Sequence, residues 1–208
     1  MGRRRATLGQ SRPTLLVSRG VVLRPWSRGD LVQLTSAYAD DDVRRWTPIG
    51  RSLDDRTTAA IFLSNAERYW RMDLPNFAIA RERDLLGAIG CVAKPAPGEL
   101  EIAYWLTKEA RGSGIATEAL TVMSRWALGL TGVHTLRAEI VKGNLASLNC
   151  ARRAGFVVRG EIQRKYADSD VTAVVWDTVL SGQPTESCTT GEPELAKPSC
   201  PGYSLEIG

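Results

Sequence analysis

The 208-residue chain has a single histidine, His134, and only four cysteines, Cys91, Cys150, Cys188 and Cys200. A metal centre built from several histidines is therefore excluded, and the cysteines show neither a CxxC pair nor another metal-ligand spacing. We expect Cys91 and Cys150, which fall inside predicted elements, to be buried thiols, and His134 to be a surface residue of a turn. Scattered cysteines without a disulfide framework indicate a reducing compartment, so the predicted location is the cytoplasm.

Long apolar runs are also missing. Hydrophobic residues make up 43% of the chain, which is enough for one sizeable core, yet no run approaches the length of a membrane span. The N-terminal residues lack the apolar segment that a secretory signal requires. The sequence therefore predicts a single domain with no membrane partner.

The net charge of +4 comes partly from an arginine cluster at residues 3–5. Nucleic-acid binders usually show a basic face interleaved with aromatics, or a known motif, and this sequence shows neither. We interpret residues 1–17 as a basic flexible arm, and a contact of this arm with RNA or the ribosome stays open. Residues 182–208 have several Pro, Gly, Ser, Thr and Glu and little periodicity, which predicts a disordered tail. The domain is expected to span residues 18–181.

Within that domain, residue periodicities alternate between those of strands and helices. Strands are predicted at residues 21–26, 76–81, 85–93, 99–106, 136–141, 156–162 and 171–180. Helices are predicted at about residues 28–38, 52–70, 115–130 and 144–155, with a further turn near residues 43–46. Three short strands joined by tight polar turns favour an antiparallel meander. The expected fold is mixed α/β (α+β), with a mostly antiparallel central sheet flanked by helices.

The most informative stretch is Ala-Arg-Gly-Ser-Gly-Ile-Ala-Thr at residues 110–117. Two glycines permit a positive φ and a close approach of a ligand to the backbone, and the following helix presents free N–H groups and the positive end of its dipole. Arg111 adds a planar, permanently charged fork that suits phosphate. The stretch predicts a pyrophosphate site. A Walker A sequence is absent, and Thr117 stands where a Rossmann fingerprint needs its third glycine.

The pattern Arg-x-x-Gly-x-Ala at residues 111–116 resembles the acetyl-CoA loop of the GNAT acyltransferase superfamily. Downstream, Asn-x-x-Ser at residues 144–147, followed by Gly-Phe at 155–156, resembles the second half of the same fold in its RimJ/RimL-like branch. The resemblance covers roughly residues 21–180. Members of that branch acetylate protein N-termini, antibiotics and small amines.

This resemblance implies an acetyl-CoA-dependent N-acetyltransferase in which an amine attacks the thioester directly in a ternary complex. The pantetheine arm would lie beside residues 99–106, which splay away from residues 136–141. Asn144 would reach the pantetheine amides, and it is equally suited to be a helix N-cap. The residues assigned to the co-substrate are Arg111, Gly112, Ser113, Gly114, Ile115, Ala116, Thr117, Asn144 and Ser147.

The catalytic candidates also come from the resemblance. Glu101 would act as the base, with Glu139 as a weaker alternative, and the other interpretation of Glu101 is a surface or salt-bridged strand glutamate. Many GNAT enzymes protonate the departing thiolate with a tyrosine, but Ala151 stands at that position, so Ser147 is the candidate donor and Tyr166 a further one. A backbone amide of the strand at residues 99–106 would bind the oxyanion.

Two further questions stay open. A non-catalytic acyl-CoA-binding module would keep the same fold, and the absence of tyrosine at position 151 is compatible with it. Trp46, Tyr69 and Trp70 lie in the region that shapes the acceptor pocket in this family, and each would be either core or part of a substrate wall. The sequence identifies neither the acceptor amine nor the oligomeric state, and a homodimer is compatible with it.

Overall fold

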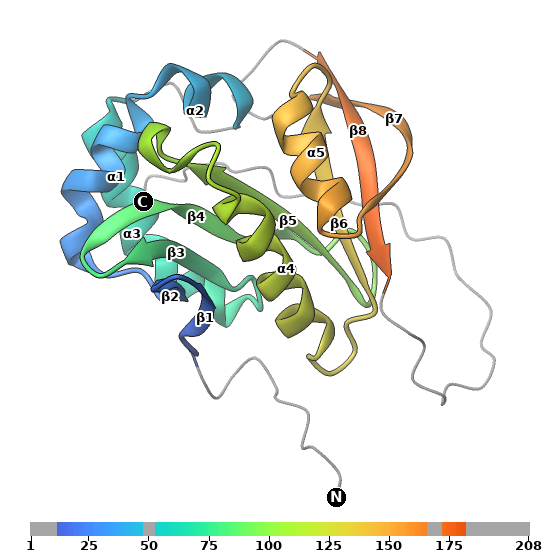
Figure 1. Ribbon diagram of the computed structural model, residues 1–208, viewed down its shortest axis with the longest axis horizontal. Helices are drawn as coiled ribbons and strands as arrows, with labels where there is room; N and C mark the ends of the chain where they lie inside the picture. The colour runs from blue at the N-terminus through green and yellow to red at the C-terminus, as the bar shows by residue number, and fades with distance from the viewer. Residues whose placement is uncertain (1–11, 48–52, 166–171, 182–208) are drawn as a thin grey trace, which may run out of the picture.

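The computed structural model describes residues 12–47, 53–165 and 172–181. Within these residues, one eight-stranded sheet has the order β1-β2-β3-β4-β5-β6-β8-β7 and carries helices on both faces (Figure 1). The strands are β1 (Leu15–Ser18), β2 (Val21–Arg24), β3 (Asn76–Arg81), β4 (Asp84–Ala93), β5 (Glu99–Leu106), β6 (Thr135–Val141), β7 (Val157–Lys165) and β8 (Thr172–Ser181). The helices are η1 (Arg28–Asp30), α1 (Leu31–Tyr38), α2 (Asp41–Trp46), α3 (Asp55–Arg71), η2 (Lys108–Ala110), α4 (Ile115–Leu128) and α5 (Leu145–Arg153).

The predicted fold class is confirmed. Between the described strands every adjacent pair is antiparallel except β5 and β6, which run parallel. A parallel pair needs a crossover, and here η2 and α4 supply it. The predicted meander corresponds to β3, β4 and β5, and each predicted helix is present with its ends shifted by a few residues.

Two hydrophobic clusters lie on opposite faces of the sheet. On one face, the apolar stripe of α4, including Leu120 and Met123, packs with α5 against Phe77, Ile89 and Ile102. On the other face, α1, α2 and α3 pack over alternate residues of the same strands, Ala78 of β3 among them. The ribbon shows this layering, with α4 and α5 in front of the sheet and α3 behind it (Figure 1). Because strand residues alternate between faces, each position of β5 belongs to one layer or the other.

Two sequence predictions need correction. Residues 15–17 were assigned to the flexible arm, but they belong to β1, which pairs with β2 through a tight turn containing Arg19 and Gly20 at positive φ. The pattern was missed because four residues are too short to show a period. Cys150 was expected to be buried, yet it is only partly buried, whereas Cys91 is fully buried. His134 is exposed, as predicted.

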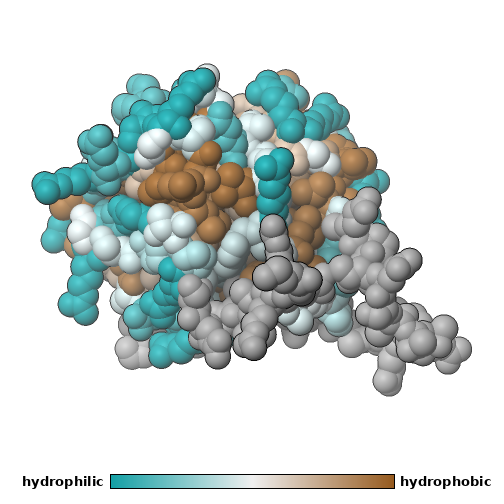
Figure 2. All heavy atoms as spheres, turned by 60° about the horizontal axis from the view of Figure 1, so that its bottom comes forward, coloured by the Kyte–Doolittle hydropathy of each residue, from teal (hydrophilic) through white to brown (hydrophobic). Residues whose placement is uncertain are grey.

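On the face shown in Figure 2, apolar side chains gather in the middle, and hydrophilic side chains border them above and to the left. No helix within the described residues is long and apolar enough to cross a membrane. The described residues also include no group of three or more potential metal ligands. Residues 1–11 of the predicted arm, Tyr166 and the predicted tail at 182–208 lie outside the described residues.

Candidate active site

The candidate site is built around an opening in the sheet between β5 and β6. The two strands pair only at their first three positions, up to Glu101 opposite Arg137. Both strands continue beyond that point, β5 to Leu106 and β6 to Val141. The last five residues of β5 therefore have no β6 partner, and their backbone groups on that side are open to a ligand, apart from the Leu106 carbonyl, which accepts from Arg111. This is the splay that the sequence predicted for the pantetheine arm.

A cavity of about 390 Å³ occupies this opening and reaches both faces of the sheet. On the α4–α5 face it is lined by Tyr104, Ala116 and Ser147. On the α1–α3 face it is lined by aromatic side chains that include Tyr38 and Trp105. Two reactants can therefore enter from opposite faces and meet at the level of the opening.

The loop before α4 has the geometry of an anion site. Gly112 and Gly114 have φ values of 71° and 84°, in the left-handed region that glycine adopts without strain. Gly114 is the N-cap of α4, so the first N–H groups of that helix have no acceptor within the helix. A Cβ at either glycine would meet no atom within 4 Å, so the loop leaves open space above its backbone. These features fit a pyrophosphate.

The other loop residues contribute through their backbone more than through their side chains. The Ile115 side chain is buried in the core, and the Ser113 hydroxyl donates to the carbonyl of Ala110 at 2.6 Å. Thr117 lies in the first turn of α4, and its buried hydroxyl has no hydrogen-bond partner within the described residues. Of the predicted loop residues, Arg111, Gly112 and Ala116 line the cavity.

Arg111 has partners that the sequence did not predict. Its guanidinium donates to Asp40 Oδ1 at 2.5 Å, to Asp42 Oδ2 at 2.9 Å and to the Leu106 carbonyl at 3.2 Å. Burial would raise the pKa of Asp40, but hydrogen bonds from Arg111 and from the amides of α2 outweigh it and lower that pKa. The ion pair therefore persists at neutral pH. It ties the start of α2 to residues 111–114, the loop before α4, which is called the anion loop below.

The far end of α2 reaches the other side of the opening. Trp46, its last residue, lies beside Gly143 in the β6–α5 turn, where an added Cβ would be 3.9 Å from the indole ring. Asp40 is the N-cap of the helix, and its side chain accepts from the amide of Val43 at 2.9 Å. α2 thus spans the opening from the β5 side to the β6 side.

Asn144 is the N-cap of α5, as one of its two predicted roles requires. Its side-chain oxygen accepts from the Ser147 amide at 3.1 Å. That bond uses the oxygen only, so the side-chain NH₂ group stays available for an acceptor such as a pantetheine carbonyl. Both predicted roles are compatible with this geometry.

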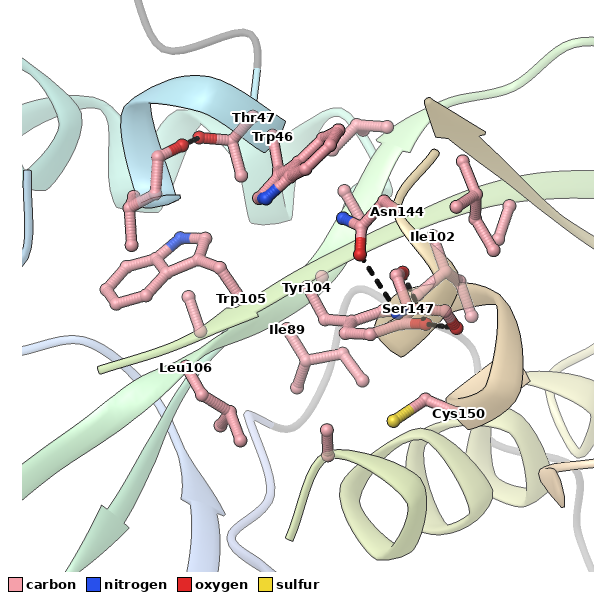
Figure 3. Close-up of a pocket in the computed structure, with 18 of the residues that line it drawn as sticks. Trp46, Thr47, Ile89, Ile102, Tyr104, Trp105, Leu106, Asn144, Ser147 and Cys150 are labelled. Atoms are coloured by element: carbon pink, nitrogen blue, oxygen red, sulfur yellow. Dashed lines mark hydrogen bonds between the residues drawn. The ribbon is translucent and has the colours of Figure 1, made fainter. Parts of the chain in front are cut away.

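Ser147 is hydrogen-bonded to a tyrosine that the sequence analysis missed. The Ser147 hydroxyl donates to the Tyr104 hydroxyl at 2.9 Å, and the Tyr104 hydroxyl donates to the Ser147 carbonyl at 2.9 Å (Figure 3). Burial raises the pKa of Tyr104, and the bond from Ser147 only partly offsets this. Tyr104 is therefore a neutral hydroxyl at physiological pH. Strand alternation along β5 could have assigned Tyr104 to the face of Ile102, but nothing in the sequence pairs it with Ser147.

The two candidate bases have different surroundings. Glu139 on β6 is almost fully buried and is held by Arg164, whose Nε donates to Glu139 Oε2 at 2.6 Å and whose Nη2 donates to Oε1. Glu101 lines the cavity from β5 and, by strand alternation, shares the face of Trp105. It therefore lies on the opposite face of β5 from Tyr104.

The alternatives left open for three aromatic residues are resolved by the structure. Trp70 is a core residue, in edge-to-face contact with Phe77 and Trp126. Trp46 and Tyr69 line the cavity. The sequence could not separate these cases, because all three are large aromatics on or beside helices of similar pattern.

The comparisons with known proteins agree with this geometry. A family model described as "Acetyltransferase (GNAT) domain" matches residues 21–157. No curated protein matches the chain significantly by sequence. Among solved structures, RimJ of Mycobacterium smegmatis with CoA-disulfide is 22% identical, over 82% of this chain and 87% of that chain, with a TM-score of 0.69.

Two other solved structures are similar to a comparable degree. RimL, a ribosomal-protein α-N-acetyltransferase in complex with coenzyme A, is 19% identical over 81% of this chain and 98% of that chain, with a TM-score of 0.67. The microcin self-immunity acetyltransferase MccE, solved with acetyl-CoA and AMP, is 14% identical over 79% and 94%, with a TM-score of 0.68.

The fold and the opening define a CoA-dependent acyltransferase. The chain belongs to the GNAT acetyltransferase family. The predicted family, enzyme class and co-substrate are thereby confirmed: acetyl-CoA is the donor and an amine the acceptor.

Proposed function

We propose that this protein acetylates a primary amine, either a protein N-terminal α-amine or a small-molecule amine, by direct attack in a ternary complex. The observation that carries the proposal is the cavity through the β5–β6 opening, which offers separate entrances to the donor and the acceptor. The α-amines of proteins have pKa values near 7.7–8.0, so a useful fraction is already neutral at physiological pH. Holding such an amine against a thioester supplies much of the rate enhancement.

The residues divide into donor and acceptor groups. The amides at residues 112–116 would hold the pyrophosphate, β5 and the Asn144 side chain the pantetheine, and an amide of β5 the oxyanion. The Tyr104–Ser147 pair would protonate or hydrogen-bond the departing thiolate, and Glu101 would accept the proton of the amine, directly or through water. In this scheme the amine attacks the thioester carbonyl carbon, the carbon–sulfur bond breaks, and CoA leaves as the thiol.

The defining experiment is acetyl transfer measured by CoA thiol release and by product mass. The panel should hold peptides with different N-terminal residues and free primary amines. A product heavier by one acetyl group supports the proposal. Binding of acetyl-CoA without transfer to any amine would favour the non-catalytic module instead.

The other expectations accompany this proposal as predictions. The described cysteines are free thiols, which supports a cytoplasmic location. A ribosome contact through residues 3–5 and a homodimer remain predictions. The first would show as salt-sensitive ribosome binding that is lost when residues 1–12 are deleted, and the second as a dimer mass in solution.

Glu101→Gln is expected to flatten the acidic limb of the pH–rate profile, because the group that must be ionised to accept a proton is gone. The measurement is kcat/KM between about pH 6 and 9. Glu139→Gln is the matched control, since Glu139 is engaged by Arg164 and should keep the limb while losing some stability. An unchanged limb in the Glu101 variant would remove Glu101 as the base.

Arg111→Ala is expected to raise the Kd for acetyl-CoA by about 3- to 10-fold, because it removes a cation and leaves two carboxylates facing the phosphate site. Asp40→Asn combined with Asp42→Asn in the Arg111→Ala background should restore part of the affinity, since the repulsion is then removed. Calorimetry at two salt concentrations measures both effects. Equal affinity in all variants would mean that Arg111 serves only to attach α2.

A further inference from the structure

Aromatic rings line the cavity on the side where the acceptor would enter. Four of the rings on this α1–α3 face pack in contact: the centroid of the Tyr38 ring lies 6.4 Å from that of Phe62 and 6.1 Å from that of Trp105. The Phe62 and Tyr69 centroids are 5.9 Å apart. These four residues are called the aromatic wall below. They come from α1, α3 and β5, so three separate elements of the fold build it.

The wall is adjacent to the reacting centre. Trp105 follows Tyr104 directly on β5, and Glu101 lies on the same strand face as Trp105. Figure 3 shows Trp105 and Trp46 at the end of the cavity away from Cys150. An amine held near Glu101 therefore places the group that carries it against the aromatic wall.

The rings of the aromatic wall suit an ammonium group better than an anion. Aromatic faces attract an ammonium group and repel a carboxylate or phosphate. The cavity's basic residue, Arg111, is engaged by Asp40 and Asp42, and Glu139 is engaged by Arg164. No described lysine or histidine lines the cavity. The aromatic faces therefore carry the preference for an amine.

We infer that the acceptor carries an aromatic ring close to its primary amine, an arrangement found both in 2-phenylethylamine and in a peptide with N-terminal phenylalanine. This inference rests on the proposed function and specifies its substrate class. The aromatic wall holds the ring, and Glu101 removes the proton of the ammonium form before attack. Polyhydroxylated amino sugars and polyamines lack the ring, so they bind more weakly.

The test compares kcat/KM for 2-phenylethylamine, ethylamine and spermidine with saturating acetyl-CoA. Burial of a ring predicts a preference for 2-phenylethylamine over ethylamine of about 10- to 100-fold. Peptides beginning with Phe and with Gly distinguish the source: a Phe-peptide used better than 2-phenylethylamine indicates a protein N-terminus, and the reverse indicates a free amine. Both results support the inference, whereas equal use of 2-phenylethylamine and ethylamine overturns it.

Phe62→Leu keeps an apolar side chain but removes a ring from the wall, and should lower the ratio of 2-phenylethylamine to ethylamine turnover by about 2- to 10-fold. Leu63→Ala is the matched control, since Leu63 packs on the same cluster but does not line the cavity. It should lower the melting temperature without changing the ratio. An unchanged ratio in a folded Phe62→Leu variant contradicts the inference.

The failure of the proposed function would look different. If no amine is acetylated, the function fails, and calorimetry of 2-phenylethylamine and ethylamine with the CoA-bound protein then tests the wall alone. Tighter binding of 2-phenylethylamine supports the substrate class, and equal binding overturns it. If ethylamine and spermidine are acetylated as well as 2-phenylethylamine, the function stands and only the substrate class is wrong.

Discussion

Gly114→Val should raise the Kd for acetyl-CoA by at least about 100-fold. At a φ of 84° the valine is strained, and its methyl groups would fill the open space above the backbone amides where a phosphate must lie. Hydrogen bonds to a charged group contribute about 1.5–3 kcal/mol each, so losing two of them accounts for a loss of this size. Titration calorimetry with acetyl-CoA gives the Kd directly.

The chain offers a matched control in Gly132. This glycine has a φ of 81° and open space around its Cβ position, like Gly114, but it lies in the α4–β6 turn and not in the loop before α4. Gly132→Val should therefore impose a similar backbone strain and a similar loss of melting temperature, while acetyl-CoA affinity stays unchanged. The assignment of the anion loop would be wrong if both variants bind acetyl-CoA as tightly as the parent chain.

The anion loop and the sheet were predictable because the physical reasons are local. Two glycines, a small-residue run and an amphipathic helix lie next to one another in the chain, and their backbone requirements do not depend on distant residues. The meander likewise follows from short strands joined by tight turns. The order of β7 and β8 and the position of α2 depend on long-range pairing, which a single sequence shows poorly.

The functional partners of the predicted residues were not readable for the same reason. Arg111 is 71 residues from Asp40, and Tyr104 is 43 residues from the Ser147 that it contacts. Spacing along the chain reports neither contact. The resemblance to a family supplied Ser147, but the tyrosine beside it comes from a strand whose motif drew attention to Glu101 instead. Residue types alone could not decide which aromatics are core and which line the cavity.

Tyr104→Phe should lower kcat by about 10²- to 10⁴-fold with little change in the Kd for acetyl-CoA, the usual range for the loss of a positioned proton donor. Burial raises the pKa of Tyr104, so its hydroxyl keeps its proton as the pH rises past the ordinary value near 10. The alkaline limb of the pH–rate profile therefore does not arise from this residue. It should remain unchanged in the variant even though kcat is lower at every pH.

Ser147→Ala should lower kcat within the same range, because the Ser147 hydroxyl donates to Tyr104 and fixes the direction in which the Tyr104 proton points. If the two hydroxyls act as one unit, the double variant will be no slower than the slower single variant. Ser124→Ala is the control for loss of a buried hydroxyl, since Ser124 on α4 has no hydrogen-bond partner within the described residues and does not line the cavity. Single-turnover measurements isolate the chemical step. Multiplicative losses in the double variant would show that the hydroxyls act separately, and an undiminished rate in both single variants would leave positioning of the amine as the whole of catalysis.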